Sequence, residues 1–230
     1  MSCILNIETS TTTCSVALSE NGACIFAEEN QQGPNHIEIL GTFLDEALSF
    51  ADNHAIPVDA VAISCGPGSY TGLRIGISMA KGICFGRNIR LIAVPTLEVL
   101  CIPVLLEEDE LSDNSLLVPM LDARRMEVYS EIFNRSLKSI KPISAEIINS
   151  ESYREYLDRG PVYFFGNGAS KCKGTINHPN ARFIDNIKPL AKNMLPLAEK
   201  RMAIEQFEDV VYFVPLYLKD FVSKQPRKLL

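Results

Sequence analysis

The sequence lacks any pair of cysteines in a C-x-x-C pattern, although it contains seven cysteines among 230 residues. An odd number of thiols without metal-ligand spacing argues against a disulfide framework and favours free thiols in a reducing compartment. Histidines are also scarce, with three at positions 36, 54 and 178, and no H-x-x-x-H pattern occurs. We therefore expect no metal centre built from these residues.

A signal peptide and a long apolar run are missing as well. The first residues, MSCILNIETS, carry no basic region before a long apolar segment, and no run approaches the ~18 apolar residues that a membrane span needs. The net charge of −6 means that the field of the whole protein does not attract nucleic acid, and the basic residues of the tail 223–230 read as a solvated terminus. We expect a cytoplasmic protein that does not contact membranes.

The well-known phosphate-binding loops are absent too. Residues 65–76, CGPGSYTGLRIG, place four glycines where a strand should lead into a helix. Their spacing fits neither G-x-x-x-x-G-K-[ST] nor G-x-G-x-x-G. A helix start capped by Ser69 or Thr71 could still attract an anion, and plain turn geometry is the alternative.

The apolar pattern that is present predicts an α/β fold. Three strands come first, and Asn21-Gly22 predicts a hairpin between the second and the third. Asn35-x-x-Glu38 predicts the start of a helix. The strand at 58–64 is apolar on both faces, and with a helix to about Phe85 and a strand at 90–94 it forms a right-handed crossover unit.

The second half of the chain reads as a looser copy of the first. The acidic stretch 107–114 is the best candidate linker, after which strands, a short helix, a further strand and a glycine turn follow in turn. We predict two related α/β lobes, residues 1–106 and 107–230. The last helical segment, around 190–207, is able to pack back on the first lobe.

The predicted helix after the glycine turn carries a stripe without large side chains. Gly72, Gly76 and Ala80 recur at i, i+4 and i+8. Each glycine inside a helix costs ~0.8–1 kcal/mol relative to alanine, a loss that is tolerated where another backbone comes close. That neighbour is either the first helix of the same chain or a helix of a partner.

A search for catalytic residues yields none. No G-x-S-x-G nucleophile motif occurs. Cys65 precedes a helix start, which can lower a thiol pKa, but it also ends a buried strand, so an inert core cysteine is favoured. The segment Asp122-Ala-Arg124-Arg125 either binds an anionic group or forms surface ion pairs.

Four segments together resemble the TsaB (YeaZ) family, the bacterial partner proteins in making threonylcarbamoyladenosine on tRNA. They are IETS at 7–10, GPGSYTGLRIG at 66–76, LDARRMEVY at 121–129 and PLYLK at 215–219. The long glycine segment is highly specific, and the matches span nearly the whole chain. The resemblance implies two actin/Hsp70-like (ribonuclease H-like) lobes with mixed sheets and helices packed on them.

The resemblance also implies a catalytic partner, the paralogue TsaD, once called a glycoprotease. Where TsaD carries a His-x-x-x-His metal pair, this sequence has Thr96 and Leu100, which cannot hold iron or zinc. Glu8 stands where actin-like ATPases have an aspartate, and the nucleotide turn of the second lobe is reduced to GNGA at 166–169. We expect no cofactor of its own, with ATP or ADP and metal supplied through the complex with TsaD and the ATPase TsaE.

The implied function is that of a non-catalytic scaffold or activator. It would bind TsaD and support ATP-dependent threonylcarbamoyl transfer to adenosine 37 of tRNAs that decode ANN codons, meeting tRNA only through the complex. A homodimer is the alternative assembly. An actin-like enzyme, either a metal-dependent peptidase or a small-molecule kinase, is the alternative function, and a tRNA-binding module using Arg124, Arg125 and the basic tail is a third.

The resemblance places the partner interface on the first two helices of the amino lobe. The residues predicted there lie on or beside the glycine stripe: Ile37, Leu40, Leu44, Gly72, Gly76 and Ala80. A second group lies at the start of the glycine-rich helix and is predicted to contact a nucleotide or anion at a shared interface: Ser69, Tyr70, Thr71 and Arg74.

Overall fold

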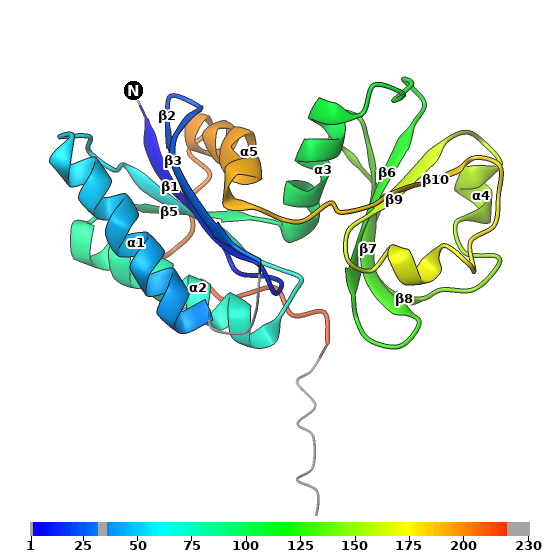
Figure 1. Cartoon of the computed structure of the whole chain (residues 1–230), viewed down its shortest axis with the longest axis horizontal. Helices are drawn as coiled ribbons and strands as arrows, with labels where there is room; N and C mark the ends of the chain where they lie inside the picture. Colours follow the sequence, from blue (N-terminus) through cyan, green and yellow to red (C-terminus); the bar gives the residue numbers. More distant parts are fainter. Residues whose placement is uncertain (1, 32–35, 220–230) are drawn as a thin grey trace, which may run out of the picture.

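The chain folds into two five-stranded sheets with helices packed on them, which lie side by side in Figure 1. The structure, a computed structural model, describes residues 2–31 and 36–219, with side chains from residue 39 onward in the second range. In chain order the elements are β1 (Cys3–Glu8), β2 (Cys14–Glu20), β3 (Ala23–Asn30), α1 (His36–Asn53), β4 (Ala60–Ser64), α2 (Tyr70–Arg87), β5 (Arg90–Val94), α3 (Thr96–Glu107), β6 (Leu116–Asp122), β7 (Glu127–Asn134), β8 (Ser139–Ile147), α4 (Arg154–Leu157), β9 (Val162–Phe165), the short 3-10 helix η1 (Ser170–Cys172), β10 (Ala181–Ile184) and α5 (Ala191–Ala203).

The two sheets share one topology. The first has the order β3-β2-β1-β4-β5, with the β1–β2 and β2–β3 pairs antiparallel and the β1–β4 and β4–β5 pairs parallel. The second, read from β8 to β10, has the order β8-β7-β6-β9-β10 with the same alternation of antiparallel and parallel pairs. This repeat confirms the prediction of two related α/β lobes.

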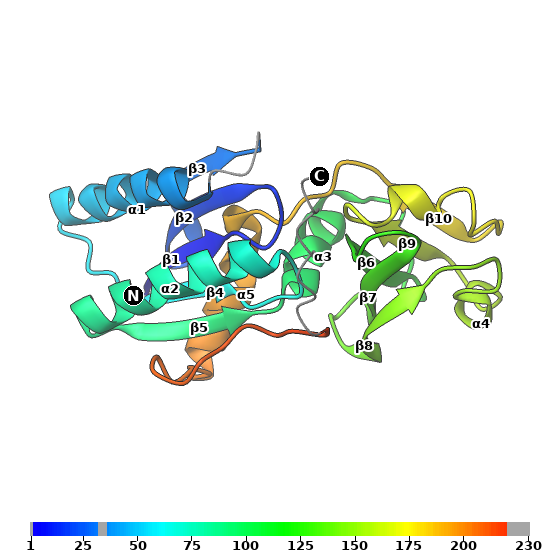
Figure 2. The same cartoon turned by 90° about the horizontal axis from the view of Figure 1, so that it is seen from below.

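The inner strands of the first sheet, β2, β1 and β4, are buried on both faces. Alternate residues of β1 and β4, such as Leu5 and Ile63, pack into one core beneath α1 and α2. Their neighbours, such as Ile4 and Ala62, belong to a second core with residues of α3 and α5. Since side chains alternate across a strand, a run apolar at every position requires cover on both sides. Figure 2 shows α1 and α2 beside each other over the first sheet.

Helix α3 was not predicted. It is apolar all round and contains Pro103, so it lacks the periodicity by which a surface helix is recognised. Leu97 and Leu100 pack into the core of the second lobe, whereas Val99 and Ile102 pack against the first sheet and α5. The helix lies between the lobes and is buried by both of them.

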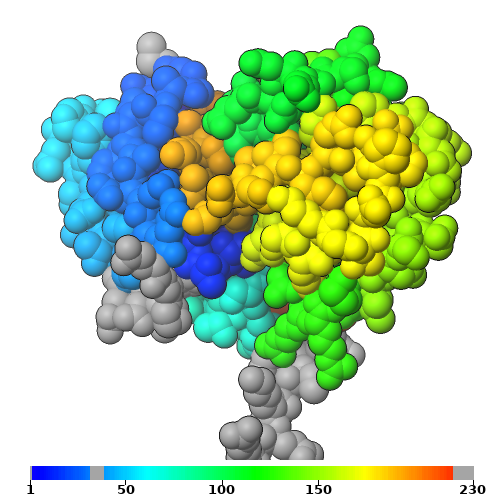
Figure 3. Space-filling model, turned by 45° about the vertical axis from the view of Figure 1, so that its right-hand side comes forward, coloured from blue at the N-terminus to red at the C-terminus, as the bar shows by residue number. Residues whose placement is uncertain are grey.

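The segment after β10 returns to the first lobe. Helix α5 packs on β1, β2 and β5, and Arg201 forms a 2.8 Å ion pair with Glu98 of α3. In Figure 3 the orange residues of α5 and the segment leading into it lie between the blue first lobe and the yellow and green second lobe. The division of the chain at residues 106 and 107 remains a prediction.

The predictions for the first hairpin and for the start of the first helix have different outcomes. Asn21 and Gly22 have φ angles of 50° and 81°, which confirms the predicted hairpin. The predicted helix cap at Asn35 lies outside the described residues. Within residues 2–31 and 36–219, no helix combines the length and the apolar character that crossing a bilayer requires.

Candidate functional site

The glycine turn between β4 and α2 is a close approach of two backbones. The Ser69 amide donates to the Ser10 carbonyl at 2.6 Å, and the Ser69 hydroxyl caps α2 by accepting from the Gly72 amide at 3.2 Å. A Cβ on Gly68 would lie 2.3 Å from the Ser10 carbonyl oxygen, so only glycine fits there. The turn therefore holds the start of α2 against the chain that follows β1.

The glycine stripe of α2 lies on the same part of β1. A Cβ on Gly76 would lie 2.3 Å from Thr9 Oγ1 and 3.0 Å from Ile63 Cδ1. Thr9, the residue after β1, donates its hydroxyl to the Gly72 carbonyl at 2.8 Å, so a buried hydrogen bond joins the end of β1 to α2. The close neighbour of the stripe is the sheet of its own lobe.

These contacts correct the predicted partner surface. Small and apolar residues at helical spacing mark the face of a helix that packs, and here that face packs within the lobe. The exposed fraction of the two leucines is 6 % or less, and the other three residues are buried as well: Leu40, Leu44, Gly72, Gly76 and Ala80. The side chain of Ile37 lies outside the described part of the chain.

The solvent-facing side of α1 and α2 has a different set of residues, called here the outer α1–α2 surface. An added Cβ would meet no heavy atom within 4 Å at Gly41, Gly82 or Gly86. Phe85 is 83 % exposed. Half-buried apolar side chains lie on both helices: Ile39, Phe43, Ile75, Met79 and Ile83.

An ion pair fastens the far ends of these two helices. Arg87 Nη1 and Nη2 donate to the two carboxylate oxygens of Asp52 at 2.9 and 2.7 Å. Hydrogen bonding to Arg87 lowers the pKa of Asp52. The fork fixes how α1 lies against α2, although both partners face water and such pairs contribute little stability.

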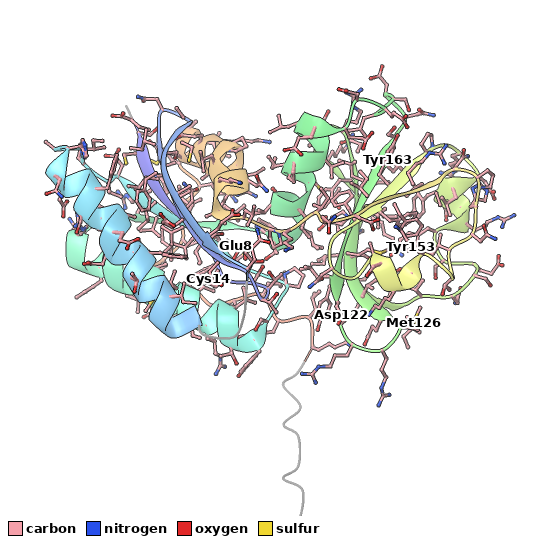
Figure 4. All side chains as sticks on the ribbon, viewed as in Figure 1. Glu8, Cys14, Asp122, Met126, Tyr153 and Tyr163 are labelled. Atoms are coloured by element: carbon pink, nitrogen blue, oxygen red, sulfur yellow. The ribbon has the colours of Figure 1, made fainter. Side chains whose placement is uncertain are left out.

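A cleft with a volume of about 1070 Å³ lies between the lobes. Its first wall is the turn after β1 and the start of α2, and its second wall is the β6–β7 hairpin with Asn167. Residues 216–219 of the C-terminal segment also line it. Figure 4 shows Glu8 in the first lobe and Asp122 at the lower edge of the second.

The residues predicted to contact a nucleotide or anion are partly brought together here. Ser69, Tyr70 and Thr71 line the cleft. Arg74 instead donates its Nε–H to the Tyr217 hydroxyl at 2.9 Å. The Ser69 hydroxyl already serves as the helix cap, and a nucleotide contact at this position remains a prediction.

The sequence analysis missed the role of the C-terminal segment in this site. The Tyr217 ring packs on Tyr70 with 5.1 Å between ring centroids, and Lys219 forms an ion pair with Glu127 of β7. In the sequence, the segment 215–219 matched a family motif, and no structural role was predicted for it. Its alternation of apolar, aromatic and basic residues was the signal available.

The glycine turn of the second lobe repeats the arrangement of the first. A Cβ on Gly168 would lie 2.9 Å from the Leu121 carbonyl carbon, and the Asn167 side chain accepts from the Asp122 amide at 2.9 Å. Lys171 contacts the Asp122 carboxylate and donates to the carbonyls of Arg125 and Glu127. This turn holds the end of β6, as the first turn holds the end of β1.

The β6–β7 hairpin bears the two arginines of the sequence motif. Arg124 and Arg125 have φ angles of 73° and 51°, a conformation that non-glycine residues rarely adopt, and both are exposed. The Arg124 amide donates to the Asp122 carboxylate at 3.0 Å.

Glu8 is fully buried beside the cleft. Its Oε1 accepts from the Ser10 amide at 2.6 Å, and burial raises the pKa of the carboxyl. Thr96 and Leu100 are also fully buried, in the first turns of α3. Among residues 2–31 and 36–219, no group of three or more His, Cys, Asp and Glu side chains is placed to hold a metal ion.

The cysteines agree with the expectation of free thiols. All seven are unpaired. Cys65 follows β4 and is half-buried, and burial raises the pKa of its thiol to about 12, which disfavours the reactive thiolate.

Comparison with known proteins gives matches along most of the chain. Residues 30–224 match the family model described as TsaD: tRNA N6-adenosine threonylcarbamoyltransferase. The chain is 28 % identical over 229 residues to the tRNA threonylcarbamoyladenosine biosynthesis protein TsaB of Haemophilus influenzae, covering 96 % of this chain and 94 % of that protein. It is 30 % identical over 178 residues to TsaB of Bacillus subtilis, covering 75 % and 74 %.

A solved structure from Pseudomonas aeruginosa, described as an uncharacterized protein with similarity to peptidase YEAZ, has the same fold. It superposes with a TM-score of 0.81 at 24 % identity, covering 95 % of this chain and all of that one. The likeness agrees with the fold described above, two lobes that are each built on a five-stranded mixed sheet.

Proposed function

Since the chain belongs to the TsaB (YeaZ) family and acts in tRNA threonylcarbamoyladenosine biosynthesis, we propose that it does so as a scaffold that binds a TsaD paralogue and leaves the transfer chemistry to that partner. The proposed reaction is the ATP-dependent transfer of a threonylcarbamoyl group to adenosine 37 of tRNA. In this proposal, nucleotide and metal are held by the partner and by the ATPase TsaE.

The outer α1–α2 surface is the observation that carries the proposal. It offers apolar side chains on two adjacent helices, an almost fully exposed phenylalanine, and three glycines at which another backbone can approach. Exposed apolar residues grouped in this way are typical of protein interfaces. The charge of −6 supports the same reading, since the lone chain is poorly suited to bind tRNA.

The absence of metal-binding histidines, at the positions that correspond to the metal site of TsaD, supports a non-catalytic role. At the places where the resemblance puts the metal-binding histidines of TsaD, this chain has Thr96 and Leu100. Each glycine turn approaches the end of its own lobe's first strand, at Ser10 just after β1 and at Leu121 near the end of β6. Each turn holds together elements of its own lobe, which gives a reason for its presence that needs no bound phosphate.

The test is complex formation by a variant of the outer surface. Gly82→Arg places a long charged side chain on this surface without a steric clash and removes a helix glycine, so the monomer should remain folded. Gly174→Arg is the matched control, because that glycine is equally open but lies in the second lobe. Light scattering after size-exclusion chromatography with TsaD of the same organism should show a 1:1 complex for the parent and Gly174→Arg, and none for Gly82→Arg.

Binding of Gly82→Arg with the parent's affinity would refute this surface as the interface. Failure of the parent itself to bind TsaD, with ATP and TsaE present, would refute the scaffold function. A homodimer of the free protein that dissociates on adding TsaD would agree with one surface serving both assemblies.

The interlobe cleft is the observation that favours the alternative, an actin-like enzyme. A cleft of about 1070 Å³ lined by hydroxyl groups is large enough for a small-molecule substrate. Calorimetry with ATP and Mg²⁺ on the lone chain tests it. Micromolar binding would support an enzyme, and heats equal to those of dilution would exclude independent use of ATP.

A further inference from the structure

The last described part of the chain, residues 208–219, runs outside the named helices and strands and is called here the C-terminal belt. It starts at β5, where the Glu208 amide donates to the Leu91 carbonyl at 2.8 Å. Along α2 it is held by Lys81, whose Nζ donates to the Val211 and Phe213 carbonyls at 2.9 and 3.1 Å. In Figure 2 this red segment passes the first lobe and ends beside the second.

The middle of the belt is fixed to the first lobe by backbone. The Leu216 amide donates to the Cys65 carbonyl at 2.8 Å. Gly66 has a φ of +109°, and a Cβ there would lie 2.8 Å from the Leu216 carbonyl oxygen. A side chain at position 66 would therefore push the belt away, so the glycine turn is shaped to admit it.

The end of the belt contacts both lobes within three residues. Tyr217 packs on Tyr70 and accepts from Arg74, whose guanidinium also lies 4.1 Å from the centre of the Tyr70 ring. Two residues later, Lys219 forms an ion pair with Glu127 at the start of β7 and lies 5.9 Å from the centre of the Tyr129 ring. Tyr217 and Lys219, which are two residues apart in the belt, therefore contact opposite walls of the cleft.

We infer that the C-terminal belt is a latch between the lobes: Leu216 and Tyr217 anchor it to the first lobe, and Lys219 engages Glu127 to hold the cleft closed. The two attachments differ in strength. The anchor includes a backbone hydrogen bond and an aromatic stack, whereas the Lys219 and Glu127 side chains are 40 % and 22 % exposed. A partly solvated ion pair changes an equilibrium by about tenfold at most, which suits a contact that opens and closes.

The position of α3 gives the latch a hinge. Val99 and Ile102 of α3 are buried against the first sheet and α5, while Leu97 and Leu100 are buried against the second lobe. The lobes therefore stay joined through α3, and release of Lys219 widens the cleft at the edge where the belt crosses it. Since the belt also follows α2, a partner on the outer α1–α2 surface would meet a segment that controls the cleft.

The experiment uses the lone chain and a fluorescent reporter. The sequence contains no tryptophan, so Tyr217→Trp supplies a single indole, which keeps an aromatic ring beside Tyr70 and Arg74 although it lacks the hydroxyl that accepts from Arg74. Adding Lys219→Glu to this variant places two carboxylates opposite each other. We expect a red-shifted indole emission, stronger quenching by acrylamide and a larger radius of gyration in small-angle X-ray scattering.

Two further variants make the result specific. Glu127→Lys combined with Lys219→Glu restores an ion pair with reversed charges and should return emission and radius to the parent values. Lys173→Glu, which breaks the Lys173–Asp185 pair within the second lobe, makes the same charge change and should leave both unchanged. An unchanged radius and emission in Lys219→Glu, or the same opening in Lys173→Glu, would overturn the latch. Neither outcome depends on TsaD, so the proposed scaffold function is tested separately.

Discussion

The close contact between α2 and β1 gives a prediction of opposite sign for two glycines of one helix. Gly76→Ala and Gly82→Ala make the same chemical change in the interior of α2. At position 76 the new methyl group would lie 2.3 Å from Thr9 Oγ1, whereas at position 82 it would meet no heavy atom within 4 Å. Gly76→Ala should destabilise the protein, and Gly82→Ala should stabilise it.

The expected sizes follow from three contributions. Alanine in place of glycine favours the helix by ~0.8–1 kcal/mol at either position. At position 76, inserting a methylene-sized group into a filled core costs typically about 1–3 kcal/mol. Displacing Thr9 also weakens its 2.8 Å hydrogen bond to the Gly72 carbonyl, which contributes about 0.5–1.5 kcal/mol. The net loss at position 76 is therefore about 0.5–4 kcal/mol, against a gain of up to ~1 kcal/mol at position 82.

The assay is urea unfolding followed by circular dichroism at 222 nm. A third variant, Thr9→Ala, removes the hydroxyl that the new methyl group meets. In the Thr9→Ala background the remaining close atom is the end of the flexible Ile63 side chain, so Gly76→Ala should become neutral or slightly stabilising. The two positions should thus show a coupling energy of about 1–3 kcal/mol in a double-mutant cycle.

The reasoning would be refuted if Gly76→Ala unfolded at the same urea concentration as Gly82→Ala. That result would mean that the stripe is not packed on β1, and the original assignment of Gly72, Gly76 and Ala80 to a partner surface would have to be restored. A destabilised Gly76→Ala that is not rescued by Thr9→Ala would place the clash elsewhere in the core.

Two further predictions concern groups that burial perturbs. Burial raises the pKa of Glu8 above its usual 4.5, so the stability that depends on a protonated Glu8 is fully present below pH 4.5 and is lost as the pH rises through the pKa of the folded state. Glu8→Gln should therefore gain stability relative to the parent as the pH rises from 4 to 8 in urea unfolding, and a constant difference between the two proteins across this range would contradict the prediction. Among the seven thiols, Cys24 is exposed, whereas burial raises the pKa of Cys65 to about 12. A thiol reagent at pH 8 should therefore label one cysteine rapidly in the native protein and all seven in urea. Loss of the fast phase in Cys24→Ser checks the assignment, and rapid labelling of Cys65 would refute it.

The helix stripe illustrates what a pattern alone leaves undecided. The spacing of Gly72, Gly76 and Ala80 correctly indicates a closely packed face, but the atoms nearest Gly76 belong to the side chains of Thr9 and Ile63 and not to a backbone. Two neighbours were considered, a helix of the same chain and a helix of a partner, and the true neighbour is the end of β1. Residues 9 and 76 are far apart in sequence, and no local signal states that they meet.

The amino-acid sequence by itself determined the two α/β lobes, the hairpin at Asn21-Gly22, the unpaired thiols and the family. These features depend on strand periodicity, on turn residues with positive φ and on specific motifs, all of which are local properties of the chain. The segment 66–76 is distinctive for the same reason, because several of its positions require glycine where any side chain would clash.

Tertiary structure decided which face of α2 is free, where α3 lies and what residues 208–219 do. Helix α3 is buried by both lobes, so it has no polar side from which its period can be read. The belt has no regular hydrogen bonding of its own and takes its course from single contacts with Cys65, Arg74 and Glu127. Contacts between residues so distant along the chain depend on how the two lobes are placed in the folded protein, and a sequence pattern of short range cannot encode them.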